Sequence, residues 1–281
     1  MNPALLSSGV VLILSALFAL LPVVLLSDDW ILRLYIVFGQ AHFLLAYLYT
    51  KKAGKFNRTY VAKFLFLLIV VGLTSFIIPR NDLYFITIAG LIFVFHYIND
   101  EFKLGALGSL RNKLLLTTAV ALAFTSLFLV KMFSSSVGLV YVMGVGALFF
   151  AALFAREMVV QKAITRQNAA PLLFFLLNIA APVYLVFNEN ISVIQVLGFI
   201  ILFHYIRWYI YYLQKFKGAE LAFYLRAVAL CNIFVLLVAL EYMFAGYSGL
   251  LYVFFDPNFF YGWTVIHVFL SVRREDYTLT G

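Results

Sequence analysis

The side chains in this sequence with the clearest chemical potential are its four histidines, His42, His96, His204 and His267. Each stands inside a long apolar run, where an ionisable side chain is costly to keep and is by default a candidate for function. Neutral imidazole is the commonest metal ligand in proteins. The first chemistry to consider is therefore the binding of one metal ion by several of these side chains.

The four histidines stand at similar distances from the next basic residue of the chain. His42 precedes Lys51 by 9 residues, and the corresponding intervals are 7 for His96, 11 for His204 and 6 for His267. At a helical rise of 1.5 Å per residue, each imidazole is about 9–17 Å from the charged end of its helix. The spacing predicts one layer of histidines and favours a shared metal site. Separate structural roles and a proton relay are the alternatives.

The donor set narrows the choice of cofactor. Nitrogen ligands without a thiolate suit iron, copper or zinc. Haem is a competitor, because bis-histidine haem is also held between facing helices. A single haem would leave two histidines unused, and two stacked haems would need histidines at two depths, so the pattern favours a single non-haem ion.

Several polar and aromatic side chains stand close to the histidines in sequence. Asp100 and Glu101 follow His96 by about one turn, where a carboxylate could accept the second N–H of a ligand imidazole or act as a catalytic group. The alternative for this acidic pair is a helix end that faces lipid headgroups. The candidates for substrate contacts are Tyr97, Tyr205, Arg207, Trp208 and Trp263.

The elements that position these residues are predicted to be membrane helices. Of the 281 residues, 65% are apolar and 11% are charged, whereas a soluble domain is about 45–50% apolar and about 25% charged. A spanning helix needs about 20 mostly apolar residues. The sequence predicts an all-α bundle of about ten spans that forms one domain over residues 1–281. The expected spans are 5–26, 30–50, 60–79, 83–100, 114–133, 137–160, 171–188, 191–213, 222–245 and 259–273.

The basic residues predict the orientation of this bundle. Of the 20 Lys and Arg residues, 17 fall on one side of the expected spans, and only Arg33, Arg80 and Lys131 fall on the other. Basic loops stay cytoplasmic, so we expect a plasma (inner) membrane protein with both termini in the cytoplasm. The net charge of +8 is then an orientation signal, and the composition excludes nucleic acid as a partner.

The segments around two of the histidines repeat each other. Residues 95–98 read Phe-His-Tyr-Ile, residues 203–206 read the same, and a glycine precedes each phenylalanine by five residues. The interval is 108 residues, and His42 precedes His96 by half of it. Self-similarity of this kind indicates repeated structural units, here helical hairpins of about 54 residues. A chance match within a phenylalanine-rich sequence is the alternative.

The histidine motifs resemble those of the bacterial and archaeal integral-membrane β-carotene dioxygenases, the bacteriorhodopsin-related-protein family. Residues 96–102, His-Tyr-Ile-Asn-Asp-Glu-Phe, are similar to the family's His-Phe-Gly segment, which ends in an acidic residue and Phe. Residues 203–208 are similar to its middle motif, in which arginine follows the histidine, and His267 is similar to its late histidine. Two positions depart from the pattern. His42 is followed by Phe43 rather than by glycine, and Trp208 stands where the family has a second histidine.

The resemblance implies an intramembrane non-haem iron oxygenase, in which histidines hold Fe(II) and the partners are dioxygen, membrane lipids and a carotenoid, isoprenoid or other hydrophobic lipid substrate. Either His267 would then replace the missing second histidine of the middle motif, or the metal would be absent. The aromatic residues, 19% of the chain, suit an apolar cavity for such a substrate. The alternatives are a zinc-dependent lipid hydrolase with Glu101 as its base, a haem-binding subunit, and a non-enzymatic lipid or proton carrier.

Overall fold

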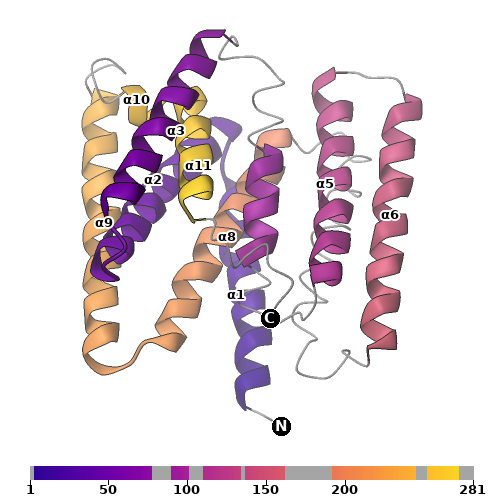
Figure 1. Ribbon diagram of the computed structural model, residues 1–281, viewed down its shortest axis with the longest axis horizontal. Coiled ribbons are helices and arrows are strands. Elements are labelled where there is room, and N and C mark those ends of the chain that lie inside the picture. The colour runs from indigo at the N-terminus through magenta and orange to yellow at the C-terminus, as the bar shows by residue number, and fades with distance from the viewer. Residues whose placement is uncertain are drawn as a thin grey trace. The chain divides into compact units, whose positions relative to one another are not determined.

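The computed structural model describes residues 3–77, 90–100, 110–133, 137–161, 192–244 and 252–271, and these residues form helices without any strand. Residues 90–100 are helical. The predicted span 171–188, residues 83–89 of the predicted span 83–100, and Glu101 lie outside the described residues. The helices with defined ends, labelled in Figure 1, are α1 (Pro3–Leu25), α2 (Asp28–Lys52), α3 (Arg58–Ile77), α5 (Leu110–Phe133), α6 (Val137–Val160), α8 (Val193–Lys215), α9 (Gly218–Phe244), α10 (Tyr252–Phe255) and α11 (Pro257–Ser271).

Length and composition make several of these helices membrane spans. Within the described part of the chain, four helices are long and apolar enough to cross a membrane: Asp28–Lys52, Gly138–Val160, Ile194–Lys215 and Gly218–Phe244. Their outward surface is apolar too, as on α9, which exposes Leu230, Phe234 and Leu237. A continuous apolar exterior is unsuited to water, and a helix satisfies its own backbone polar groups in lipid. The protein is therefore an all-helical membrane protein.

The chain divides into two compact units, each built from separate stretches of sequence. Unit 1 contains Met1–Ile13, Leu83–Val196 and Val272–Gly281, and unit 2 contains Leu14–Asp82 and Leu197–Ser271. In unit 1, α5 and α6 form an antiparallel hairpin (Figure 1). Ser126 Oγ donates to the carbonyl oxygen of Val140 at 3.2 Å, and Arg111 pairs with Glu157 at 3.0 Å across the other end. These contacts hold the two helices in register.

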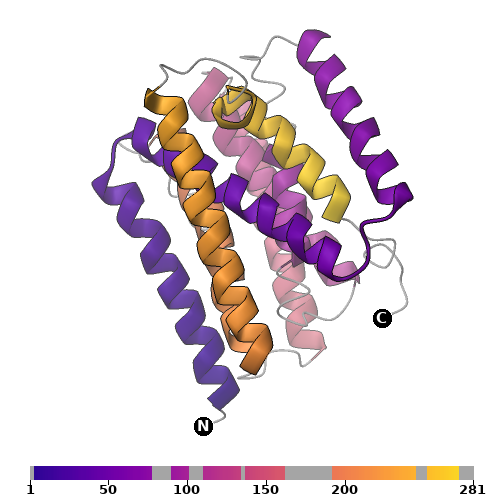
Figure 2. The ribbon, with the colours of Figure 1, turned by 90° about the vertical axis from the view of Figure 1, so that its left-hand side faces the viewer.

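In unit 2, α2 is the helix against which most of the others pack. It contacts α9, α10 and α11, and α11 in turn packs on α3 (Figure 2). Gly39 allows a close approach of α11 to α2, because a Cβ atom at this position would lie 2.5 Å from Cζ of Phe260. The last apolar run is interrupted at Asp256, between α10 and α11, as expected from its Asp-Pro-Asn sequence. Gln40 Nε2 donates to the carbonyl oxygen of Phe254 at 2.6 Å and ties α10 to α2.

Aromatic rings fill the junction of α2, α8 and α9. Trp208 and Tyr212 of α8 and Phe216, which directly follows the last residue of α8, are spaced four residues apart, with successive ring centroids 5.0 and 5.1 Å apart. We call these three residues the aromatic column. Tyr49 of α2 stacks on Phe216 at 5.8 Å, and Tyr224 of α9 joins the same cluster. The ends of α2 and α8 therefore lie together with the start of α9.

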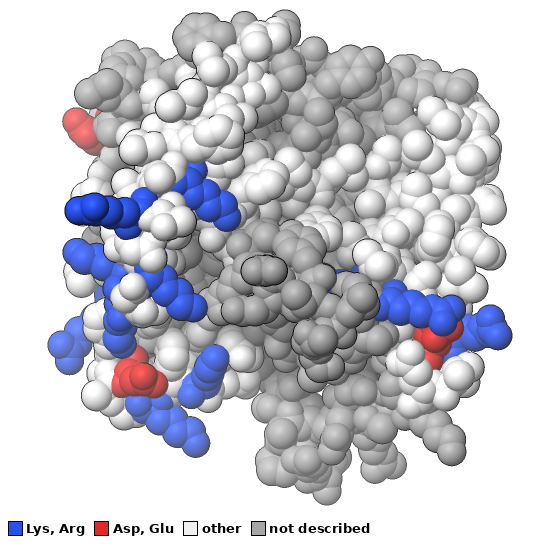
Figure 3. Space-filling model, in the orientation of Figure 1, with Lys and Arg blue, Asp and Glu red and all other residues white. Residues whose placement is uncertain are grey.

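Basic side chains gather at this same end of unit 2 (Figure 3). Lys51 and Lys52 close α2, Arg58 opens α3 and Lys215 closes α8. Lys52 lies 4.1 Å from the ring centroid of Phe223, a cation–π contact. Basic and aromatic side chains side by side are typical of the water–lipid interface, so this end of the unit is suited to the membrane surface.

Candidate metal centre

Three of the four histidines lie together in unit 2. The ring of His42 on α2 is 5.6 Å from the ring of His204 on α8 and 5.2 Å from that of His267 on α11, measured between centroids. All three side chains are buried. The predicted common depth thus holds for these three residues, which come from helices far apart in the sequence.

The rings of these three histidines are neighbours, but among the described residues their ligand nitrogen atoms do not all lie within 4.8 Å of one another. Two imidazoles that bind one metal at about 2.1 Å have ring centroids about 5 Å apart, close to the 5.2 and 5.6 Å observed. The same distances also fall in the range of about 4.5–7 Å for ordinary aromatic packing. The ring spacing therefore does not by itself distinguish a metal site from aromatic packing. The chemistry of the donors is what favours a metal, because neutral imidazoles are ligands for iron and zinc alike.

Other rings hold the three imidazoles in place. Tyr205 stacks on His42 at 4.9 Å and an interplanar angle of 29°. Phe43 stacks on His267 at 4.5 Å and 26°, and its other neighbour is Phe260 at 5.8 Å. The ring planes of His42 and His267 are thus fixed by neighbouring aromatic planes rather than left free to turn.

Two further rings border the cluster. Trp208, at the head of the aromatic column, lies 6.3 Å from His42 and 6.4 Å from His204. Tyr47 of α2 lies 6.5 Å from His267, in an edge-on arrangement. Tyr205 and Trp208 were expected beside the histidines from the sequence, whereas Phe43 and Tyr47 were not. The signal that could have found them is the four-residue stripe along α2 formed by Tyr35, Gly39, Phe43 and Tyr47.

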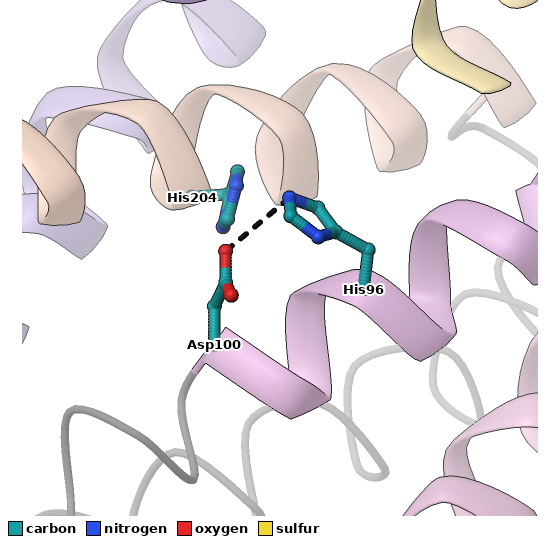
Figure 4. Close-up of side chains that lie close together, drawn as sticks. All are labelled: His96, Asp100 and His204. Carbon is teal, nitrogen blue, oxygen red and sulfur yellow. Dashed lines mark ion pairs between the residues drawn. The ribbon is translucent and has the colours of Figure 1, made fainter. Parts of the chain in front are cut away.

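The fourth histidine, His96, belongs to unit 1 and lies beside a carboxylate. Its Nε2 atom is 3.2 Å from Oδ2 of Asp100, one turn further along the same helix, and both side chains are buried (Figure 4). Tyr97 is buried as well and stacks on Phe93 at 6.2 Å. A buried carboxylate that contacts an imidazole can fix its tautomer and raise its strength as a ligand.

The remaining predicted substrate residues have different surroundings. Arg207 is buried on α8, so its side chain lies inside the protein rather than on the outer surface. Trp263 faces α10, because its indole nitrogen donates to the carbonyl oxygen of Val253 at 2.8 Å and its ring stacks on Phe254 at 5.4 Å. The structure thus places Tyr205 and Trp208 beside the histidine cluster, and Trp263 against the short helix that precedes α11.

Comparisons of this chain with protein families, with curated proteins and with solved structures find no match.

Proposed function

We propose that this protein is an intramembrane non-haem iron oxygenase that acts on a carotenoid, an isoprenoid or another hydrophobic lipid. The observation that carries the proposal is the cluster of His42, His204 and His267, three buried imidazoles from three helices, in which the rings of His204 and His267 lie 5.6 and 5.2 Å from the ring of His42. Several ionisable side chains inside a membrane are costly to keep, and such residues generally mark a functional site.

In this proposal the three clustered histidines hold Fe(II), which when bound supplies open coordination positions for dioxygen. The residues of the chain do the positioning. Tyr205 and Phe43 set the planes of the imidazoles that they contact. The apolar helices around the cluster exclude water, which suits an alkene or another apolar substrate better than a sugar or a nucleotide.

We assign His96 to the same iron as a fourth ligand, on the evidence of its sequence position. Its distance from the basic end of its helix predicts the layer occupied by the other three histidines. Asp100, 3.2 Å from the His96 ring, would orient this ligand, and Glu101 is a second candidate acid. Substrate contacts are assigned to Tyr97, Tyr205, Arg207, Trp208 and Trp263.

The membrane arrangement that accompanies this function has about ten spans, repeats of about 54 residues and both termini in the cytoplasm of a plasma (inner) membrane. Its support is the unequal distribution of Lys and Arg between alternate loops. Cysteine accessibility tests the arrangement, because Cys231 is the only native cysteine and is buried. In a Cys231→Ala background, Lys55→Cys should react with an impermeant thiol reagent only after the cells are opened. Labelling in intact cells would reverse the proposed orientation.

The direct test of the function measures metal and activity together. The protein is expressed in a bacterial strain that accumulates β-carotene, and metal content, pigment loss and retinal formation are followed. About one equivalent of iron with oxygen-dependent pigment loss supports the proposal. Less than about 0.2 equivalents of any transition metal after purification under reducing conditions would refute it. Bound zinc would indicate a hydrolase, and a Soret absorption band would indicate haem.

The substrate is tested separately from the metal. Iron bound at about one equivalent with unchanged pigment would keep the oxygenase class and exclude carotenoids. His42→Phe provides the matched control, because it retains an aromatic ring at the centre of the cluster and lacks both ligand nitrogens. Pigment loss that persists in this variant would come from the host rather than from the protein.

A further inference from the structure

Two buried hydrogen-bond donors lie beside the three-histidine cluster and have no hydrogen-bond partner among the residues that the structure describes. They are the indole N–H of Trp208 and the phenol O–H of Tyr47. The Trp208 ring neighbours His42 and His204, and the Tyr47 ring neighbours His267. Together the two donor-bearing rings therefore border all three histidines.

Several comparable groups elsewhere in unit 2 have partners, and the hydroxyl group of Tyr49, discussed below, is an exception. The indole N–H of Trp263 donates to the carbonyl oxygen of Val253, and the hydroxyl groups of Tyr35 and Tyr261 are hydrogen-bonded to each other. Buried polar groups in proteins are nearly always hydrogen-bonded, and an exception calls for a ligand, a water molecule or a functional role. Two such exceptions next to one cluster of metal-ligating side chains point to a common cause.

We propose that Trp208 and Tyr47 are hydrogen-bond donors to a small ligand that binds at the histidine cluster, either an anion or a molecule that binds through an oxygen atom. This inference rests on the metal centre proposed above. An exogenous ligand of a metal carries negative charge on its free atoms, and those atoms accept hydrogen bonds. Indole can only donate, and phenol donates readily, so both side chains select for an acceptor without competing for the metal.

Tyr49 provides a matched control on the same helix. Its hydroxyl group is also buried and also has no hydrogen-bond partner among the described side chains and backbone. Its ring, however, packs against Phe216, Phe223 and Tyr224 at the basic end of the unit rather than against a histidine. Tyr49→Phe therefore removes the same chemical group from the same helix, two residues further along α2 and away from the histidines.

The experiment measures the binding of azide to the metal-loaded protein in detergent by isothermal titration calorimetry. Wild type, Trp208→Phe, Tyr47→Phe and Tyr49→Phe are compared, each after its metal content and melting temperature have been determined. In Trp208→Phe the new ring can still pack against Tyr212, and in Tyr47→Phe it can still pack against Phe64. We expect azide to bind about tenfold more weakly to the Trp208 and Tyr47 variants, because each loses a hydrogen bond to a charged acceptor. The Tyr49 variant should match the wild type.

The outcomes separate this inference from the function on which it rests. Metal absent from the wild type refutes the metal centre itself. Metal present with azide affinity unchanged in both the Trp208 and Tyr47 variants overturns the donor roles and leaves the metal centre standing. Metal-loaded wild type that does not bind azide also overturns the donor roles. An equal loss of affinity in the Tyr49 variant would show that the effect is not local to the histidines, and it too would overturn them.

Discussion

Replacing His42 with phenylalanine or with alanine separates two properties of the histidine cluster, ring packing and metal binding. The His42 ring contacts five other rings, at centroid distances from 4.9 Å for Tyr205 to 6.3 Å for Trp208. At the low value of about 0.5 kcal/mol for each ring pair, alanine removes about 2.5 kcal/mol of packing. Phenylalanine keeps a ring of similar size and retains most of these contacts.

The effect on metal binding is expected to be the same for both variants. Residues that only orient a metal ligand contribute about 10–100-fold to affinity. His42 is proposed as a ligand itself, and its removal should therefore weaken metal binding by more than about 100-fold, or about 2.7 kcal/mol. His42→Phe should fold as well as the metal-free wild type and bind no metal, whereas His42→Ala should lose both stability and metal.

The assay combines metal analysis with thermal denaturation of the detergent-purified protein. The wild type is measured with and without chelator, and the chelated wild type is the reference for packing alone. His42→Phe should melt within a few degrees of that reference, and His42→Ala clearly below it. A full equivalent of metal in His42→Phe would refute the reasoning, because a phenyl ring has no atom that can bind the ion.

Three further predictions concern neighbouring features. Gly39→Ala would place a Cβ atom 2.5 Å from the buried Phe260 ring. We expect this clash to destabilise the protein by about 1–3 kcal/mol, which is measurable as a lower melting temperature. An unchanged melting temperature would mean that α11 moves aside freely. Asp100→Asn should lower metal affinity about 10–100-fold in chelator competition, whereas wild-type affinity would remove this carboxylate from the site. A chelator should lower the melting temperature of the wild type, because a ligand at 1,000 times its Kd stabilises by about 4 kcal/mol. It should leave His42→Phe unaffected, and an equal shift in both would indicate a metal bound elsewhere.

The helices could be predicted from the sequence because a helix that crosses lipid must be apolar over most of its length. The expected span 30–50 corresponds to α2 (Asp28–Lys52) and the expected span 222–245 to α9 (Gly218–Phe244). The observed α2 is longer because its helix continues into polar residues at both ends, where acidic side chains favour the first turn and lysines the last. Hydropathy detects the part of a helix that lies in lipid and not these polar turns.

For the site, the sequence could predict only the position of each histidine along its helix axis. Counting residues from the basic ends placed His42, His204 and His267 at one level, and the rings of His204 and His267 each lie next to the ring of His42. Counting does not determine which faces meet. Trp263 shares a helix face with His267 by spacing, yet it packs against α10, because the break at Asp256 folds that short helix back onto it. The division into two units was not foreseeable either, since each unit combines distant segments whose association depends on side-chain packing.

The aromatic column has a consequence for the conformational entropy of binding. Aromatic side chains have few rotatable bonds and lose less entropy on ordering than the flexible chains of methionine or lysine. Trp208, Tyr212 and Phe216 pack in a row from the level of His204 to the residue that follows α8, so this stretch is ordered by the fold itself. A ligand that arrives at the histidines therefore meets a preorganised surface, and little of its binding free energy is spent on immobilising side chains.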